Sequence, residues 1–153
     1  MKRIEVKLNL QVVAPLLDLI KRTADELDGR LAAPQSFQDL DSDLRTAWRE
    51  ELLHGQNDDC RLFLGLFDHD FFATGTIGID EGNAEPVLRA CASIRLRLRE
   101  RELGKIGDDV LESGGVEVGQ ATPAVQKAYM SYVFLATVQE LIIQHLDSAL
   151  LEN

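Results

Sequence analysis

The feature of this sequence that most constrains its fold is a helix near its end that is apolar on nearly every side. Thr122 and Pro123 are typical of a helix start, because a hydroxyl can cap the first turn and proline fits the first helical position. The spacing that follows predicts a helix over residues 123–150, in which residues 133–138 carry no charge. A helix that is apolar all round has to be enclosed, so we expect it at the centre of the domain.

The segments before it predict one strand and further helices. Residues 4–10 alternate apolar and polar side chains, which predicts a strand with one buried face. Asn9 is a suitable cap for the helix that follows. Helices are predicted over residues 12–27, from Ser42 to Gly55 and over residues 84–103. A turn at residues 56–59 is predicted to follow the helix that ends at Gly55. The apolar stripe of the second helix consists of Leu44, Ala47, Trp48, Glu51 and Leu52, in which Glu51 is the one polar member.

The stretch between residues 60 and 79 fits two structures. Residues 61–67 and 71–79 are rich in aromatic residues, threonine and glycine, and they flank a short polar stretch. This composition favours a hairpin, to which the strand at residues 4–10 would add a third member. A helix over residues 59–67 is the alternative, because a short apolar run fits either period.

Together these segments predict a mainly helical α+β fold. It would be a bundle of about four helices with a small antiparallel sheet, made of the N-terminal strand and the hairpin. The helices at 84–103 and 123–150 would form its centre. The length fits a single domain over residues 1–153. Loops are expected at residues 32–36 and 105–121, the second with a short helix at 108–112.

The composition is that of an acidic globular protein. Sixteen Lys and Arg against 26 Asp and Glu give a net charge of −10, which repels phosphate backbones and disfavours nucleic acid as a partner. The apolar run at residues 132–138 is too short to cross a membrane, and the first residues lack the pattern of a signal peptide. Cys60 and Cys91 lie in apolar runs, which predicts buried free thiols and a cytoplasmic protein. No cofactor is predicted.

One polar site interrupts the apolar C-terminal helix at Gln139 and Glu140. A buried amide or carboxylate is costly unless it finds a partner. Tyr132 lies on the same strip of the helix as Gln139, and Arg95 on the other central helix is the expected partner of Glu140. These residues predict a polar clasp between the two helices. The alternative is an enzyme, in which Glu140 lies in an apolar pocket with a raised pKa and acts as acid or base.

An arginine-rich stretch covers residues 89–101. At about 100° per residue, Arg97 and Arg101 flank one side of the helix's apolar seam, and Arg95 and Arg99 flank the other. This arrangement favours ion pairs at the rim of a helix contact. The alternatives are an anion-binding site at Arg97 and Arg101, or a transcriptional regulator that contacts DNA through residues 89–101.

The histidines do not form a metal-binding pattern. His54, His69 and His145 are far apart, and none has a second histidine or a cysteine pair at ligand spacing. The sequence therefore predicts no metal site. Asp68 and Asp70 on either side of His69 leave the question of a metal open at that turn.

The last helix resembles a known family. Its segment Tyr132-Val-Phe-Leu-Ala-Thr-Val-Gln139-Glu140 is similar to a Tyr-x-aromatic-Leu-small-x-apolar-Gln-Glu pattern. That pattern is found in an uncharacterised domain-of-unknown-function family of small, mainly helical bacterial proteins. Residues 4–9 and 93–96 resemble two further stretches, although Ala92-Ser93 replaces an Asn-Asp pair and Phe134 replaces a tryptophan. The resemblance implies that Arg95, Gln139 and Glu140 belong to one structural feature.

These observations favour a non-catalytic interaction or regulatory module that binds protein, including a second copy of itself as a homodimer. Such a module predicts an exposed apolar patch. An enzyme predicts that Glu140, a histidine and a cavity converge. A DNA-binding regulator predicts that the arginines of residues 89–101 face solvent together.

Overall fold

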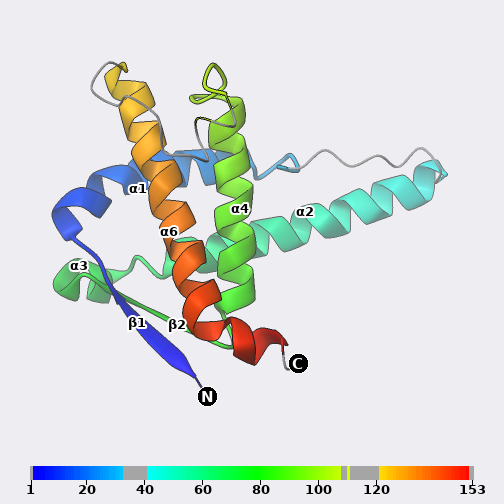
Figure 1. The fold of residues 1–153 in the computed structure, drawn as a ribbon. Helices are drawn as coiled ribbons and strands as arrows, with labels where there is room; N and C mark the ends of the chain where they lie inside the picture. Colours follow the sequence, from blue (N-terminus) through cyan, green and yellow to red (C-terminus); the bar gives the residue numbers. More distant parts are fainter. Residues whose placement is uncertain (1, 33–40, 108–109, 111–120, 152–153) are drawn as a thin grey trace.

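A computed structural model describes residues 2–32, 41–107, 110 and 121–151 and shows a mainly helical α+β fold (Figure 1). In chain order the elements are β1 (Arg3–Lys7), α1 (Leu10–Glu26), α2 (Ser42–Gly65), α3 (His69–Thr74), β2 (Thr76–Asp80), α4 (Ala84–Glu100) and α6 (Pro123–Leu151). The predicted bundle of about four long helices with a small antiparallel sheet is confirmed. None of the helices in these ranges combines the length and hydrophobicity that a membrane span requires. Most of the loops predicted at 32–36 and 105–121, with the short helix at 108–112, lies outside the described residues.

Helices α4 and α6 run antiparallel, side by side, and form the centre of the domain (Figure 1). The start of α6 is as predicted, since the Thr122 hydroxyl accepts a hydrogen bond from the backbone N–H of Val125 at 3.3 Å. Both helices contribute a row of buried side chains: Val87, Ala90, Cys91, Ile94 and Leu98 from α4, and Ala128, Leu135, Val138, Ile142 and Leu146 from α6. Helix α1 packs against both of them, and α2 packs against α4.

The sheet has two strands rather than three. Strand β1 pairs antiparallel with β2, with Arg3 opposite Asp80 and Lys7 opposite Thr76. The prediction of a strand at the N-terminus is confirmed, but the predicted hairpin over residues 61–79 is wrong, because β2 is its only strand.

The aromatic residues explain why this stretch is helical. Phe63 near the end of α2 and Phe71 in α3 are both fully buried. Phe67 lies between them and makes edge-to-face contacts with both rings, at centroid distances of 5.3 and 5.1 Å. A helix followed by a short turn brings these three rings together in one cluster. The alternative of a helix over residues 59–67 was therefore the better prediction, although α2 ends at Gly65.

Helix α2 also continues through Gly55 and residues 56–59, where the sequence predicts its end. A glycine inside a helix costs only about 1 kcal/mol, so tertiary contacts can override it. Gln56 supplies such contacts, because its side-chain amide bonds to backbone groups of Leu27, Arg30 and Ala32 at 2.9–3.0 Å. Asn57 donates to the carbonyl of Asp28 at 3.1 Å. These polar residues tie the end of α1 to α2.

The first part of α2 projects away from the rest of the domain (Figure 1). All side chains of residues 41–51, which we call the α2 arm, are exposed. Leu44 is 55% exposed and Trp48 is 51% exposed. The apolar stripe predicted for this helix is present, but its first half is not covered by any of the elements described here.

Gly75 joins α3 to β2 in a conformation that requires glycine. Its φ is 75°, in the left-handed region. Its N–H donates to the carbonyl of Phe71, and its carbonyl accepts from the N–H of Leu8, both at 2.7 Å. A Cβ at this position would lie 2.8 Å from the carbonyl oxygen of Leu8.

We therefore expect Gly75→Ala to destabilise the protein by about 2–3 kcal/mol, combining the left-handed backbone penalty with the contact to Leu8. Gly55→Ala is the matched control, since its Cβ would meet nothing within 4 Å. It lies inside a helix and should be neutral or stabilise by up to about 1 kcal/mol. Urea denaturation of both variants checks the prediction, and equal effects would contradict it.

Candidate functional site

A polar clasp formed by Arg95, Tyr132 and Gln139 joins α4 to α6. The Arg95 guanidinium donates from Nη1 to Gln139 Oε1 at 2.7 Å and from Nη2 to the Tyr132 hydroxyl at 3.0 Å. The Gln139 Nε2 in turn donates to the backbone carbonyl of Leu88 at 3.1 Å. Tyr132 is buried, and Arg95 and Gln139 are half-buried. Because these bonds connect the two central helices, they help to fix the position of α6 along α4.

Glu140 is not part of the clasp, although the sequence predicts it as the partner of Arg95. It is exposed, and its carboxylate accepts a hydrogen bond from the Gln144 side chain at 3.0 Å. Neighbouring residues on a helix point about 100° apart, so only one of Gln139 and Glu140 can face α4. An amide fits this position better than a carboxylate, because it accepts from Arg95 and also donates to the carbonyl of Leu88.

Arg97 and Arg101 bind an acidic residue of this chain, Glu26 at the end of α1. Arg97 Nε lies 3.1 Å from one carboxylate oxygen of Glu26, and Arg101 Nη1 binds the other. The side chains of Arg97 and Glu26 are 12% and 27% exposed. The anion-binding site predicted at these arginines therefore already holds an internal carboxylate, which fastens α1 to α4.

The pKa of Glu26 reflects this pairing. Burial by itself raises the pKa of this carboxyl. The hydrogen bonds and positive charges of Arg101 and Arg97 outweigh burial and hold the pKa of Glu26 below its ordinary value. Glu26 is therefore ionised in the folded protein at neutral pH.

The arginines of α4 do not form one solvent-facing row. Arg89 makes a bidentate ion pair with Asp59 of α2, at 2.9 and 3.0 Å. Arg95 is directed to α6, and Arg97 to α1. A DNA-contacting helix would present these charges together on one face, whereas here Arg89, Arg95 and Arg97 bind three different neighbouring helices.

The histidines are exposed and far from one another. The stretch predicted as a turn around His69 is the start of α3, and Asp68 caps this helix by accepting from the N–H of Phe71 at 3.1 Å. Among the described residues, no three or more His, Cys, Asp or Glu side chains are grouped so that they could hold a metal ion.

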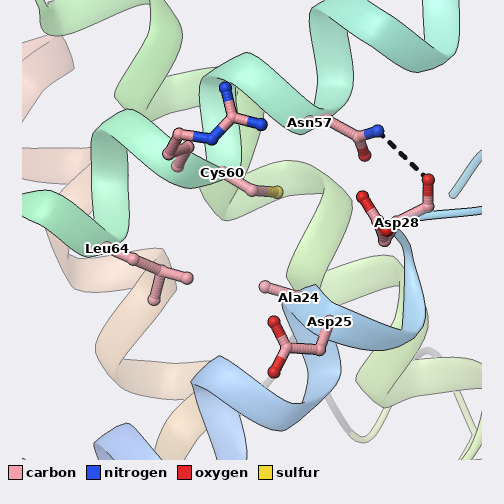
Figure 2. Close-up of a pocket in the computed structure, with 7 residues that line it drawn as sticks. Ala24, Asp25, Asp28, Asn57, Cys60 and Leu64 are labelled. Atoms are coloured by element: carbon pink, nitrogen blue, oxygen red, sulfur yellow. Dashed lines mark hydrogen bonds between the residues drawn. The ribbon is translucent and has the colours of Figure 1, made fainter.

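A cavity of about 310 Å³ lies between α2 and the end of α1 (Figure 2). Its lining consists of Ala24, Asp25, Asp28, Asn57, Cys60, Arg61 and Leu64. Figure 2 shows the Cys60 thiol and Leu64 on the α2 side and the carboxylates of Asp25 and Asp28 on the α1 side. Cys60 is the one thiol in this lining. Burial, and then the negative charge of Asp59, raise the pKa of the Cys60 thiol to about 11, so it is protonated and unreactive at neutral pH.

An apolar groove of about 380 Å³ lies between α1 and α6. It is lined by Val12, Val13, Leu16, Tyr129, Met130, Val133, Phe134 and Thr137, none of which is charged. Val12, Met130 and Val133 are 47%, 42% and 42% exposed. These side chains therefore form an exposed apolar surface beside the groove.

The sequence missed this groove because all-round apolarity in the last helix predicts complete enclosure. In the structure α6 is enclosed on the side of α4 and α1, but Met130, Val133 and Ile143 remain exposed. The apolar composition of residues 133–138 is compatible with an exposed apolar surface as well as with a core.

Comparisons of this chain with protein-family models, with curated proteins and with solved structures found no match. The resemblance of α6 to a domain-of-unknown-function family stays a prediction. The clasp, the ion pairs and the exposed apolar surfaces are therefore the features of the structure that bear on function.

We expect Gln139→Ala to destabilise the protein by about 1–3 kcal/mol, because it removes the acceptor of a half-buried Arg95 N–H and the donor to the backbone carbonyl of Leu88. The adjacent change Glu140→Ala should alter stability by no more than about 0.5 kcal/mol, since that side chain is exposed. Urea denaturation compares the two variants. A larger loss from Glu140→Ala would contradict the assignment of the clasp.

Glu26→Gln should destabilise the protein by about 1–3 kcal/mol at about pH 7, because its charged bonds to two arginines are weakened. A carboxyl whose pKa is lowered by folding contributes stability above its unfolded pKa and loses it as the pH falls through the folded pKa. The difference between wild type and Glu26→Gln should therefore shrink at about pH 3. Denaturation at both pH values tests this, and a constant difference would contradict it.

Proposed function

We propose that this chain is a non-catalytic interaction module whose groove between α1 and α6 binds an amphipathic helix of a partner protein. The observation that supports this proposal is the set of exposed apolar side chains along the groove. Val12, Met130 and Val133 are each more than 40% exposed, so the fold does not require them to be apolar. Burying them against a partner would be favourable by about 25 cal/mol for each Å² of apolar surface covered.

The shape of the groove suits a helix. Along α6 the lining residues Met130, Val133, Phe134 and Thr137 recur at helical spacing, and α1 provides the opposite wall. A partner helix would place apolar side chains at intervals of three and four residues between these walls. The absence of charge in the lining means that shape and apolar contact would determine affinity and specificity.

The alternatives have less support. An enzyme with Glu140 as its acid or base needs that carboxylate in an apolar pocket, but the side chain is exposed and bound to Gln144. A transcriptional regulator needs the arginines of α4 free to meet phosphates, but Arg89, Arg97 and Arg101 are bound to carboxylates. The buried free thiols suit a reducing compartment, and the cytoplasm is the location we propose.

Val133→Glu tests the proposal, because it places a charge in the groove at a position that is 42% exposed. We expect the fold to lose no more than about 1 kcal/mol and the binding of the partner to be abolished. Ile143→Glu is the matched control, since Ile143 is an apolar residue of the same helix that is 49% exposed and does not line the groove. Affinity purification from the source cells should recover a protein with wild type and with Ile143→Glu, but not with Val133→Glu.

Two results would contradict the proposal. One is equal recovery of the same protein by wild type and both variants. The other is a thermal shift of several degrees with a metal ion, a nucleotide or a small organic acid, which would favour an enzyme.

A further inference from the structure

The outer edge of β2 is closed by hydrogen bonds within this chain. The side-chain amide of Asn83 donates to the carbonyl of Gly78 at 3.2 Å and accepts from the N–H of Asp80 at 2.9 Å. The hydroxyl of Thr74 accepts from the N–H of Thr76 at 3.3 Å. These bonds occupy backbone groups that could otherwise pair with a further strand.

The outer edge of β1 is open. The N–H of Leu8, just after β1, donates to the carbonyl of Gly75 at 2.7 Å, so the even-numbered residues of this segment direct their backbone groups to β2. The N–H and C=O groups of Arg3, Glu5 and Lys7 therefore point away from β2. All three residues are exposed, and no hydrogen bond joins these backbone groups to any other described residue. Figure 1 shows β1 at the margin of the domain.

We propose that an extended segment of a partner protein adds to this edge as a further, antiparallel strand. The open edge presents a row of backbone donors and acceptors that repeats every two residues, or about 6.8 Å. Another extended chain matches this spacing, and main-chain hydrogen bonds supply much of the affinity when a peptide adds to a sheet edge. The exposed backbone thus defines the occupant as a polypeptide in strand conformation.

The side chains of β1 indicate the sequence that such a segment would have. Arg3, Glu5 and Lys7 share the exposed face, and opposite charges directly across a strand pair are favourable. The partner would therefore place acidic residues opposite both cations and a basic residue opposite Glu5. Its alternate residues would be apolar, because Val6 is buried and Ile4 is half-buried on the other face.

A second copy of this chain fits the edge less well. In a two-fold, antiparallel pairing centred on Glu5, β1 of one copy overlaps β1 of the other completely. Glu5 then faces Glu5, and Arg3 faces Lys7, so like charges lie directly opposite one another and destabilise the pairing. A shift by two residues removes these contacts, but one of the three positions then extends beyond β1 of the other copy. The charges therefore favour a different protein.

This inference goes beyond the proposed function, because β1 and the groove between α1 and α6 are different surfaces. None of the residues that line the groove belongs to β1. The groove offers apolar contact to a helix, whereas the edge of β1 offers backbone hydrogen bonds to an extended chain. The two can therefore fail separately.

A synthetic peptide with capped ends, Asp-Val-Lys-Val-Asp, is the probe. Titrated into the protein, it should shift the NMR amide signals of Arg3, Glu5 and Lys7. N-methylation of its lysine removes an N–H that faces β1 and should weaken binding by at least about 10-fold. N-methylation of a valine is the matched control, since the valine N–H points away from β1, and it should change the affinity by less than about 2-fold.

A charge exchange tests the pattern and the direction of the added strand. Arg3 binds Glu5 at 3.0 Å, whereas Lys7 has no ion pair among the described residues and is the better position to change. Lys7→Glu should weaken binding by about 3-fold. Replacing the first aspartate of the peptide by lysine should restore it, and replacing the last should not, because antiparallel pairing sets the first residue opposite position 7. Lys21→Glu is the matched control, since Lys21 is exposed on α1, and it should leave the affinity unchanged.

Four outcomes would overturn the inference. The first is the absence of any shift in the β1 amide signals at millimolar peptide. The second is an equal loss of affinity from N-methylation of the lysine and of the valine. The third is a set of signal changes confined to the groove between α1 and α6. The fourth is a dimer in light scattering that Glu5→Pro dissociates, which would make a second copy the occupant.

Glu5→Pro removes one N–H from the open edge but no bond to β2, so the fold should tolerate it and peptide binding should be lost. Peptide binding that is retained in Val133→Glu, while recovery of the groove's partner is lost, would support both proposals independently.

Discussion

The packing of α4 against α6 is the contact on which the other elements depend. Both helices contribute a row of buried apolar side chains, and the polar clasp of Arg95, Tyr132 and Gln139 satisfies the amide that interrupts the row on α6. Helix α4 packs against α1, α2 and α6. Its arginines bind α6 through Arg95, α1 through Arg97 and α2 through Arg89, so each neighbouring helix is held by apolar packing and by a directed polar contact.

The same arrangement accounts for the two uncovered apolar surfaces. A central helix needs cover on all sides, but among the described elements α6 receives most of its cover from α4 and α1, and the groove beside α1 remains open. Helix α2 is longer than the α4 surface that it crosses, so its first turns extend into solvent (Figure 1). These surfaces are what the fold leaves unfilled, and they are the basis for treating the chain as an interaction module.

Several arginines of α4 form contacts within the fold. The net charge is −10, yet the arginines of α4 are directed inward to carboxylates and to an amide. A basic island on an acidic protein can look like a nucleic-acid site in sequence. Here its main role is to connect helices, and the same pairing lowers the pKa of Glu26.

The sequence by itself determined the local features of this protein. Asn9 caps α1, Thr122 begins α6, and residues 3–7 form a strand, because caps and apolar periods act over a few neighbouring residues. It also placed Arg95, Tyr132 and Gln139 in one feature, since a polar group in an apolar helix has to find a partner.

Only the tertiary structure decided the rest. The aromatic run became a helix because Phe63, Phe67 and Phe71 meet in one cluster, and α2 passed through Gly55 because Gln56 holds the end of α1. The choice of Gln139 over Glu140 depended on the rotation of α6 against α4, and the exposure of Trp48 depended on how far α2 extends past α4. Apart from the aromatic cluster, whose rings are four residues apart, these outcomes come from contacts between segments far apart in the chain, which local periods and caps do not encode.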